Sequence, residues 1–460
     1  MKSSQSSSRR ACSDHATLDE WIKQQATSFS LDSPTSLNAA LDRLMASLDP
    51  SLRVLGLGEA LHGGEEILLL RNRIFQRLVE EHGFSAIALE SSFPRAQAVN
   101  EHVAGRGPKS YDDLREAGFS HGFGRLEANR ELVQWMREYN ADEAHRAKLR
   151  FYGFDSPTEM MFADSPRQVI HFFLDYLASI DGPGTGRDEE RQKIDWLLGQ
   201  DSEWENPAAM MDPKKSIGLS SDACTLRIQV EDLIAEMQVR RPELVAKNGE
   251  DRYLEAVHFA EMARKLLNYH AAQASVSEPG VSEPGRRIVQ CLGLRDAMMA
   301  DNLAYAAARE HRNHGLDGRG RVLAFAHNSH LQRGKAEWQL GSLALAWWPA
   351  GAHLSQVLGS RYAVIGTAVG VSPENGIAQP EEGSLEARLL SLPGPMRLIV
   401  TERGRRLAES EMQALAARSA SALNSTYFPL TAQSISDFDA LAVLDRTEYS
   451  RGGPELPGRE

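Results

Sequence analysis

Residues 54–66 read VLGLGEALHGGEE, an apolar run that passes directly into acidic, imidazole and glycine residues. A short continuous apolar run is typical of a strand that is covered on both faces, as in a parallel sheet. The following stretch, 65–81, carries apolar residues at helical spacing and stops at His82-Gly83, where a helix can end. The sequence around residue 60 therefore predicts a strand, a short polar turn and a helix.

Further apolar runs of strand length occur at 86–90, 149–154, 322–326, 363–367, 397–401 and 441–444. Helical patterns separate the early runs, so we predict an α/β fold with a mostly parallel sheet flanked by helices. The middle of the chain differs, because it contains long helical stretches at 166–180, 225–240, 251–273 and 286–309 and almost no strand pattern. These stretches predict an all-helical lobe that is inserted between the third and fourth strands.

The domain boundaries follow from these patterns. We expect an α/β catalytic lobe at 17–160 and 315–445, a helical lobe at 161–314, and disordered tails at 1–16 and 446–460.

Composition argues against several classes of partner. The 460 residues include 51 Lys and Arg against 63 Asp and Glu, a formal net charge of −12, which does not favour nucleic-acid binding. No stretch approaches the roughly 20 apolar residues that span a bilayer. The three cysteines are scattered and form no CxxC pair, which is typical of a protein in a reducing cytoplasm.

Acidic and imidazole side chains follow four of the predicted strands. In open α/β sheets, sites form beyond the carboxyl ends of the strands. We therefore expect one cleft to contain side chains from all four strand ends, namely Glu59, His62, Glu90, Asp155, His327 and His330.

These residue types suit water activation. An imidazole such as His62 is the usual general base near neutral pH, and a carboxylate beside it fixes its tautomer. The other histidines can stabilise an oxyanion, and Arg71, nine residues after His62, can reach back toward the same mouth. Met160, Phe162 and their neighbours are candidates for an apolar cleft wall that accepts a large amphipathic ligand.

Two alternatives remain open at this point. His62, His327, His330 and Glu90 can also form a zinc site of three imidazoles and one carboxylate. A non-catalytic protein that binds a small molecule or haem through the same histidines is the other alternative. A serine nucleophile elbow, a Walker loop, a complete dinucleotide fingerprint and an HExxH helix are all absent from the sequence.

The ordered set of motifs resembles the erythromycin esterase family, which includes proteins described as succinoglycan biosynthesis-like. The resemblance rests on Gly58-Glu59-x-x-His62, Leu89-Glu90-Ser91, Gly153-Phe154-Asp155, Arg295-Asp296-x-Met298-x-x-x-Asn302 and Ala326-His327-Asn328-x-His330.

The resemblance implies a hydrolase that cleaves a carboxylic ester or a macrolide lactone with an activated water, as in antibiotic resistance. It implies no covalent intermediate and no cofactor, with zinc as the alternative, and a small-molecule ester or lactone as the partner. The implied catalytic residues are His62 as base together with Glu59, Glu90, Arg71, His327 and His330. Our candidate substrate contacts are Asp155, Met160, Phe162 and Arg295.

Overall fold

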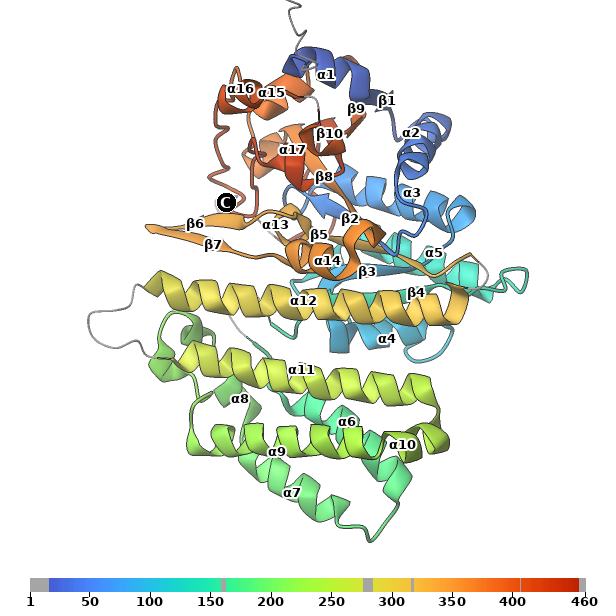
Figure 1. The fold of residues 1–460 in the computed structure, drawn as a ribbon, viewed down its shortest axis with the longest axis vertical. Coiled ribbons are helices and arrows are strands. Elements are labelled where there is room, and N and C mark those ends of the chain that lie inside the picture. Colours follow the sequence, from blue (N-terminus) through green and yellow to red (C-terminus); the bar gives the residue numbers. More distant parts are fainter. Residues whose placement is uncertain (1–15, 159–162, 276–283, 316–317, 406, 455–460) are drawn as a thin grey trace, which may run out of the picture.

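An eight-stranded sheet forms the centre of the protein in the computed structural model (Figure 1). The structure describes residues 16–158, 163–275, 284–315, 318–405 and 407–454. The strand order is β1-β9-β10-β8-β2-β5-β3-β4, and β9 runs antiparallel to both of its neighbours while the other paired strands are parallel. The strands are β1 (Ala26–Phe29), β2 (Val54–Glu59), β3 (Phe84–Ser92), β4 (Arg150–Asp155), β5 (Arg321–His327), β8 (Tyr362–Val371), β9 (Met396–Val400) and β10 (Ala440–Arg446). The predicted α/β fold class is confirmed.

Residues alternate between two cores along each central strand, because successive side chains point to opposite faces of a sheet. On β2, Val54 belongs to one core cluster, and Leu55 and Leu57 belong to the other. On β5, Ala324 and Phe325 divide in the same way. Both faces are buried, which explains why the central strands have continuous apolar sequences.

Helices cover both faces of the sheet. The helices α2 (Pro34–Ser47), α3 (Glu65–Glu81) and α5 (Glu127–Ala141) supply apolar side chains to the core that contains Leu55. The remaining helices of the first part of the chain are α1 (Leu18–Gln25) and α4 (Phe93–Val103), and α4 packs along the edge strand β4.

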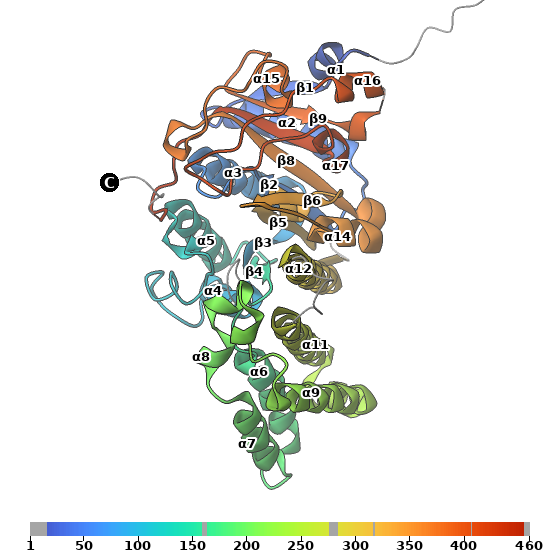
Figure 2. The ribbon, with the colours of Figure 1, turned by 90° about the vertical axis from the view of Figure 1, so that its left-hand side faces the viewer.

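The elements described between β4 and β5 are helical. They are α6 (Arg167–Asp181), α7 (Arg187–Leu198), α8 (Asp201–Trp204), α9 (Ser221–Val239), α10 (Arg241–Asn248), α11 (Glu250–Ala274) and α12 (Pro284–His314), with two short 3₁₀ turns. Figure 2 shows α11 and α12 nearly end-on, stacked between the sheet and the outer helices. Side chains of α6, α9, α11 and α12 share one core cluster with Val322 and Ala324 of β5. Helix α12 packs on β3, β4 and β5, and α11 joins it to the outer helices, so the helical lobe is continuous with the core on one face of the sheet.

Shorter elements complete the chain after β5. They are α13 (Asn328–Leu331), the hairpin β6 (Ala336–Leu340) and β7 (Leu343–Trp347), α14 (Ala350–Leu358), α15 (Leu385–Leu389), α16 (Glu409–Gln413) and α17 (Ser434–Asp437). Among the helices that the structure describes, none combines the length and the apolar character that crossing a bilayer requires.

The prediction of a disordered tail at 446–460 is wrong for residues 446–454. Arg446 still belongs to β10, and the chain then packs against the start of α3, where Glu448 donates its backbone N–H to Glu66 Oε2 at 2.7 Å. Residues 455–460 and residues 1–15 of the other predicted tail lie outside the described residues. A Gly- and Pro-rich composition does not reveal backbone hydrogen bonds to a distant segment.

Candidate active site

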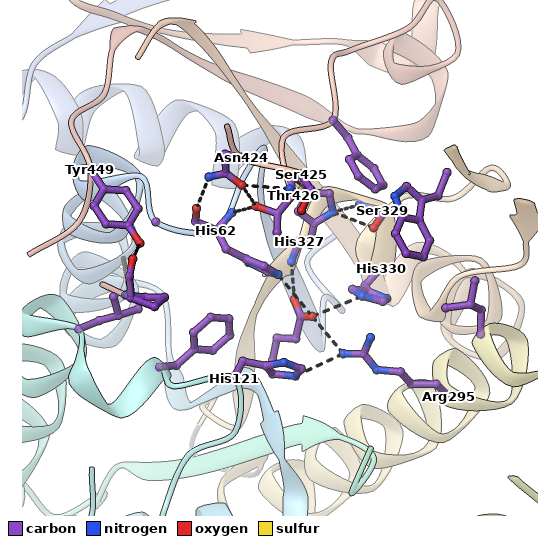
Figure 3. A pocket seen from close by; sticks show the side chains of 18 of the residues that line it. His62, His121, Arg295, His327, Ser329, His330, Asn424, Ser425, Thr426 and Tyr449 are labelled. Atoms are coloured by element: carbon purple, nitrogen blue, oxygen red, sulfur yellow. Dashed lines mark hydrogen bonds and ion pairs between the residues drawn. The ribbon is translucent and has the colours of Figure 1, made fainter. Parts of the chain in front are cut away.

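A cavity of about 310 Å³ opens beyond the carboxyl ends of β2, β3 and β5 (Figure 3). One part of its wall is polar and contains His62, Glu90, His121, Arg295, His327, Ser329 and His330. Another part is apolar and contains Phe123, Leu126, Leu292, Trp338, Trp347 and Phe428. The sheet topology explains why distant residues meet here, because β5 lies between β2 and β3 and places His327 opposite Glu59.

His62, in the turn between β2 and α3, is closely bonded to Glu59, the last residue of β2. The Nδ1 atom of His62 lies 2.7 Å from Glu59 Oε1, and its backbone N–H donates to Thr426 Oγ1 at 2.9 Å. Asn424 also donates to the His62 carbonyl at 3.0 Å, so a distant loop holds the turn in place. With Nδ1 bonded to Glu59, Nε2 is the ring nitrogen available to accept a proton from the cavity side.

Two carboxylates control the ionisation of His62. Burial alone would lower the pKa of His62, but Glu59 and Glu90 outweigh burial and leave this pKa above 6.5. The closest distance between His62 Nε2 and Glu90 Oε1 is 3.9 Å, which is too long for a direct hydrogen bond. Burial raises the pKa of Glu59, and His62 offsets this effect only in part.

Glu90 is buried at the centre of the polar wall. Its Oε1 atom lies 3.3 Å from His330 Nε2 and 3.2 Å from Arg295 Nη2, and its Oε2 accepts the backbone N–H of His327 at 2.8 Å. Burial opposes the charge, but the cationic neighbours His330, His62 and Arg295 hold the pKa of Glu90 well below its ordinary value. Glu90 is therefore an anion that contacts the side chains of His330 and Arg295 and lies near that of His62.

His330 is held as an imidazolium. Asp296 on α12 accepts from His330 Nδ1 at 2.9 Å and from the Trp347 indole N–H at 2.6 Å. Burial acts against the charged ring, but Asp296 and Glu90 raise the pKa of His330 to about 10. Both ring nitrogens of His330 consequently carry protons near neutral pH.

His327 has the opposite ionisation. Its Nε2 donates to the carbonyl of Thr426 at 2.8 Å, so its Nδ1 is the acceptor of the Ser329 hydroxyl at 2.7 Å. Burial is the main cause that lowers the pKa of His327 to about 3. His327 lines the cavity as a neutral ring with both nitrogens engaged, and not as the oxyanion donor expected from the sequence.

Arg71 is buried in the protein core, outside the wall of the cavity. Its guanidinium donates to Asn72 Oδ1 at 2.8 and 3.0 Å and lies over the Phe325 ring at 4.8 Å, and it is absent from the wall of the described cavity. Burial lowers the pKa of Arg71 to about 10, while Glu59 acts in the opposite direction. The expected contact of Arg71 with an oxyanion is therefore corrected to a buried charge near Glu59, because α3 directs this side chain into the core.

Asp155 lies outside the cavity wall and contacts two residues of that wall, Arg295 and His121. It is fully buried, and it accepts from Arg295 Nε at 3.0 Å and from Arg295 Nη2 at 2.6 Å, and His121 Nε2 lies 3.0 Å from it. Burial opposes ionisation, but Arg295 and His121 keep the pKa of Asp155 below its ordinary value. Asp155 orients Arg295 and does not line the cavity, so its expected role as a direct substrate contact is corrected. Met160 and Phe162 lie outside the described residues.

Sequence reasoning missed several groups at the site. His121, with a left-handed backbone (φ 58°), lies in an irregular segment without periodicity. Thr426 and Asn424 hold His62 from more than 360 residues away and follow no predicted strand. Asp296 follows Arg295 in a motif of the resemblance, and this position was its only sequence indication of a role at the site. Its contact with His330 is not visible in the sequence.

The donor set does not fit the zinc site considered from the sequence. His327 Nε2–H is bonded to the Thr426 carbonyl, His330 Nδ1 is bonded to Asp296 at 2.9 Å, and His330 Nε2 lies 3.3 Å from Glu90 Oε1, so both rings are already bonded to protein groups. Within the described residues, two other groups bring three donor atoms within 4.8 Å of one another, Glu59–His62–Glu90 and Glu90–His121–Asp155. In the first group His62 is bonded to Glu59, and in the second Glu90 and Asp155 are bonded to Arg295.

Comparisons with known proteins bear on both fold and family. Erythromycin esterase type II from Escherichia coli is 25% identical over 392 residues, covering 80% of this chain and 85% of that protein. The crystal structure of a Bacillus cereus protein has a TM-score of 0.68 at 18% identity, covering 95% of this chain and 98% of its own. A mutant of the erythromycin esterase EreC in its open conformation has a TM-score of 0.60 at 19% identity, covering 92% and 97%. The sequence pattern of the family described as Erythromycin esterase matches residues 79–447, and on this match the chain belongs to the erythromycin esterase family.

Proposed function

We propose that this chain hydrolyses a carboxylic ester, linear or as a lactone, with His62 as the general base that activates water. One observation carries the proposal: His62 lines the cavity, is oriented through Nδ1 by Glu59 at 2.7 Å, and presents Nε2 on the cavity side. This is the arrangement that a base needs, because the carboxylate fixes the tautomer and stabilises the imidazolium that forms.

The proposed reaction proceeds in two steps. Water attacks the ester carbonyl carbon while His62 Nε2 takes one of its protons, which gives a tetrahedral oxyanion. The carbon–oxygen bond to the alcohol then breaks, and His62 returns the proton to the leaving alkoxide. The products are one carboxylic acid and one alcohol, and the catalyst is regenerated.

Arg295 and His330 are the proposed electrophilic side of the site. Both line the cavity and both carry positive charge, because the pKa of Arg295 is raised and that of His330 is raised to about 10. A charged donor positioned in advance stabilises an oxyanion, and losing one such donor typically costs about 2.7–4 kcal/mol. Glu90, between the two cations, holds them in place and stabilises the imidazolium of His62.

Ser329 is not the nucleophile in this proposal. It donates to His327, but a histidine with a pKa of about 3 is a weak base at neutral pH. A covalent acyl-enzyme on Ser329 therefore lacks an effective base, whereas water near His62 has one.

The test is a mass-spectrometric screen of macrolides and simple esters against the wild type and a His62→Asn variant. A macrolide lactone is included because the Escherichia coli relative is named an erythromycin esterase. The expected product has the mass of the substrate plus one water, and the variant forms it far more slowly. Equal hydrolysis by the two proteins would reject His62 as the base.

The metal-dependent alternative has its own measurement. The metal content of protein purified without added ions is determined, and activity is measured with and without a chelator. We expect activity to survive chelation, because His62 can accept a proton from water directly. Stoichiometric metal together with loss of activity on chelation would overturn the proposed metal-free route.

A further inference from the structure

A segment at the end of the described chain forms the wall of the cavity beside His62. Residues 447–454, here called the C-terminal strap, contribute Tyr449 and Pro454 to this wall. Figure 3 shows Tyr449 on the opposite side of His62 from Arg295. The Tyr449 hydroxyl donates to the Pro454 carbonyl, so the two wall residues of the strap are bonded to each other.

The strap is fixed to the turn that carries the proposed base. Ser450 donates its backbone N–H to the carbonyl of Gly63 at 2.9 Å, and Glu65 donates to the carbonyl of Glu448 at 3.0 Å. Arg451 Nε also donates to Glu65 Oε1 at 2.7 Å. The residues that directly follow His62 therefore determine where the strap lies.

The ring of Tyr449 is packed between two glycines. A Cβ atom added at Gly63 would lie 2.7 Å from Tyr449 Cε2, and one added at Gly453 would lie 2.9 Å from Tyr449 Cζ. Gly63 also has a φ of +87°, a conformation that other residues rarely adopt. Any larger residue at Gly63 would displace the ring, and the ring itself has backbone on both sides. Tyr449 is consequently held in one position in the cavity wall, packed against Gly63, the residue that follows His62.

We propose that Tyr449 is a specificity-determining residue that limits the size of the group placed beside His62, so that the preferred substrates are compact carboxylic esters in place of bulky macrolides. The proposal rests on the proposed ester hydrolysis. The cavity volume of about 310 Å³ supports the proposal, because it lies at the small end of the roughly 300–1,000 Å³ that ligand pockets occupy. The match to the family pattern ends at residue 447, the first residue of the strap, so Tyr449 lies outside the matched residues.

The first experiment compares esters of increasing size. Two series, in which either the acyl or the alcohol part grows from methyl to a branched group, are assayed together with a macrolide lactone. Replacing Tyr449 by Ala is expected to raise the ratio of kcat/KM for bulky over compact esters by about tenfold or more. The matched control is Glu448→Ala, on the same strap with an exposed side chain, which should leave the ratio unchanged. An unchanged ratio in Tyr449→Ala, or an equal rise in both variants, would overturn the proposal.

A second experiment does not depend on hydrolysis. Binding of the same compounds is measured in a His62→Asn background through the fluorescence of Trp338 and Trp347, which line the cavity. Adding Tyr449→Ala should strengthen binding of the bulky compounds by a similar factor and leave compact ones unchanged. If the wild type hydrolyses no ester, the proposed function fails, and the binding ratio still decides whether Tyr449 limits size.

Discussion

Two histidines of the site, His327 and His330, lie three residues apart and have opposite ionisation states. His327 donates to a carbonyl and has a pKa of about 3, whereas His330 lies between Asp296 and Glu90 and has a pKa of about 10. Partners that the tertiary structure supplies cause this difference, because the unperturbed imidazole is the same in both. His62 lies between these extremes, with a pKa raised above 6.5 by Glu59 and Glu90.

Replacing His62 by Asn should lower kcat by about 10²–10⁴-fold, the usual contribution of a general base. Hydrolysis of the best ester from the screen and the melting temperature are measured together, and the melting temperature should remain close to that of the wild type. Ser329→Ala is the comparison variant and should lose less than about tenfold. A Ser329 variant as inactive as the His62 variant would indicate a covalent route instead.

The pH dependence of the rate follows from the raised pKa of His62. Because the base must be neutral, kcat/KM should rise with pH through a pKa above 6.5. Glu59→Gln removes an anion that stabilises the imidazolium, so the rising limb should move to lower pH while the maximal rate falls. A pH–rate profile of both proteins checks this, and a limb that stays in place would show that Glu59 does not tune His62.

At the scale of elements, α12 links the strand ends to one another. Arg295 contacts Asp155 at the end of β4 and Glu90 on β3, and Asp296 contacts His330 on α13. Asn302, seven residues or about two turns beyond Arg295, donates to the carbonyl of Phe154 at 3.0 Å. One face of α12 therefore positions the electrophilic side of the site.

The ion pair between α12 and α13 should make stability depend on pH. The pKa of His330 is raised to about 10 in the folded protein, so its contribution is complete below about 6.5 and is lost as the pH rises through about 10. Denaturant unfolding at pH 7, 8, 9 and 10 should show this decline.

Asp296→Asn tests the origin of that decline. It removes one partner of a buried pair, so it should cost about 3–5 kcal/mol of unfolding free energy near pH 7 and make the decline shallower. Asp301→Asn, on the same helix, removes only the surface ion pair with Lys265 and should change stability by less than about 1 kcal/mol. An equally steep decline in the Asp296 variant would mean that another group titrates.

At the scale of the whole molecule, the sheet and the helical lobe share one core. The same cluster contains Leu266 of α11, Leu303 of α12 and Ala324 of β5, and Figures 1 and 2 show α12 lying between the sheet and the outer helices. The site lies where α12 crosses the strand ends, so its geometry depends on both parts of the molecule.

A shared core predicts that the two parts unfold together. Leu266→Ala, at a fully buried position of the helical lobe, should cost about 2–5 kcal/mol and shift a single transition. Circular dichroism and tryptophan fluorescence should report coincident transitions in the variant and the wild type. Ile228→Ala, on an exposed face of α9, is the control with little effect. Separate transitions would show that the helical lobe is an independent domain.

The amino-acid sequence by itself determined the α/β class and the approximate elements. A continuous apolar run indicates a strand that is buried on both faces, and helical spacing of apolar residues indicates a helix that is buried on one face. Both patterns are local in the sequence. The predicted helix at 65–81 accordingly has the same bounds as α3. The positions of Glu59, His62, Glu90, His327 and His330 at strand ends were likewise visible, because polar residues directly follow apolar runs.

Only the tertiary structure decided how these groups work. It placed β5 between β2 and β3, directed Arg71 into the core, and folded residues 447–454 against the turn after His62. It also gave His327 and His330 different partners, Thr426 and Asp296, from distant parts of the chain. The physical reason is that a residue pattern encodes which faces are buried, whereas hydrogen-bond partners, pKa values and cavity walls depend on contacts between segments far apart in the chain.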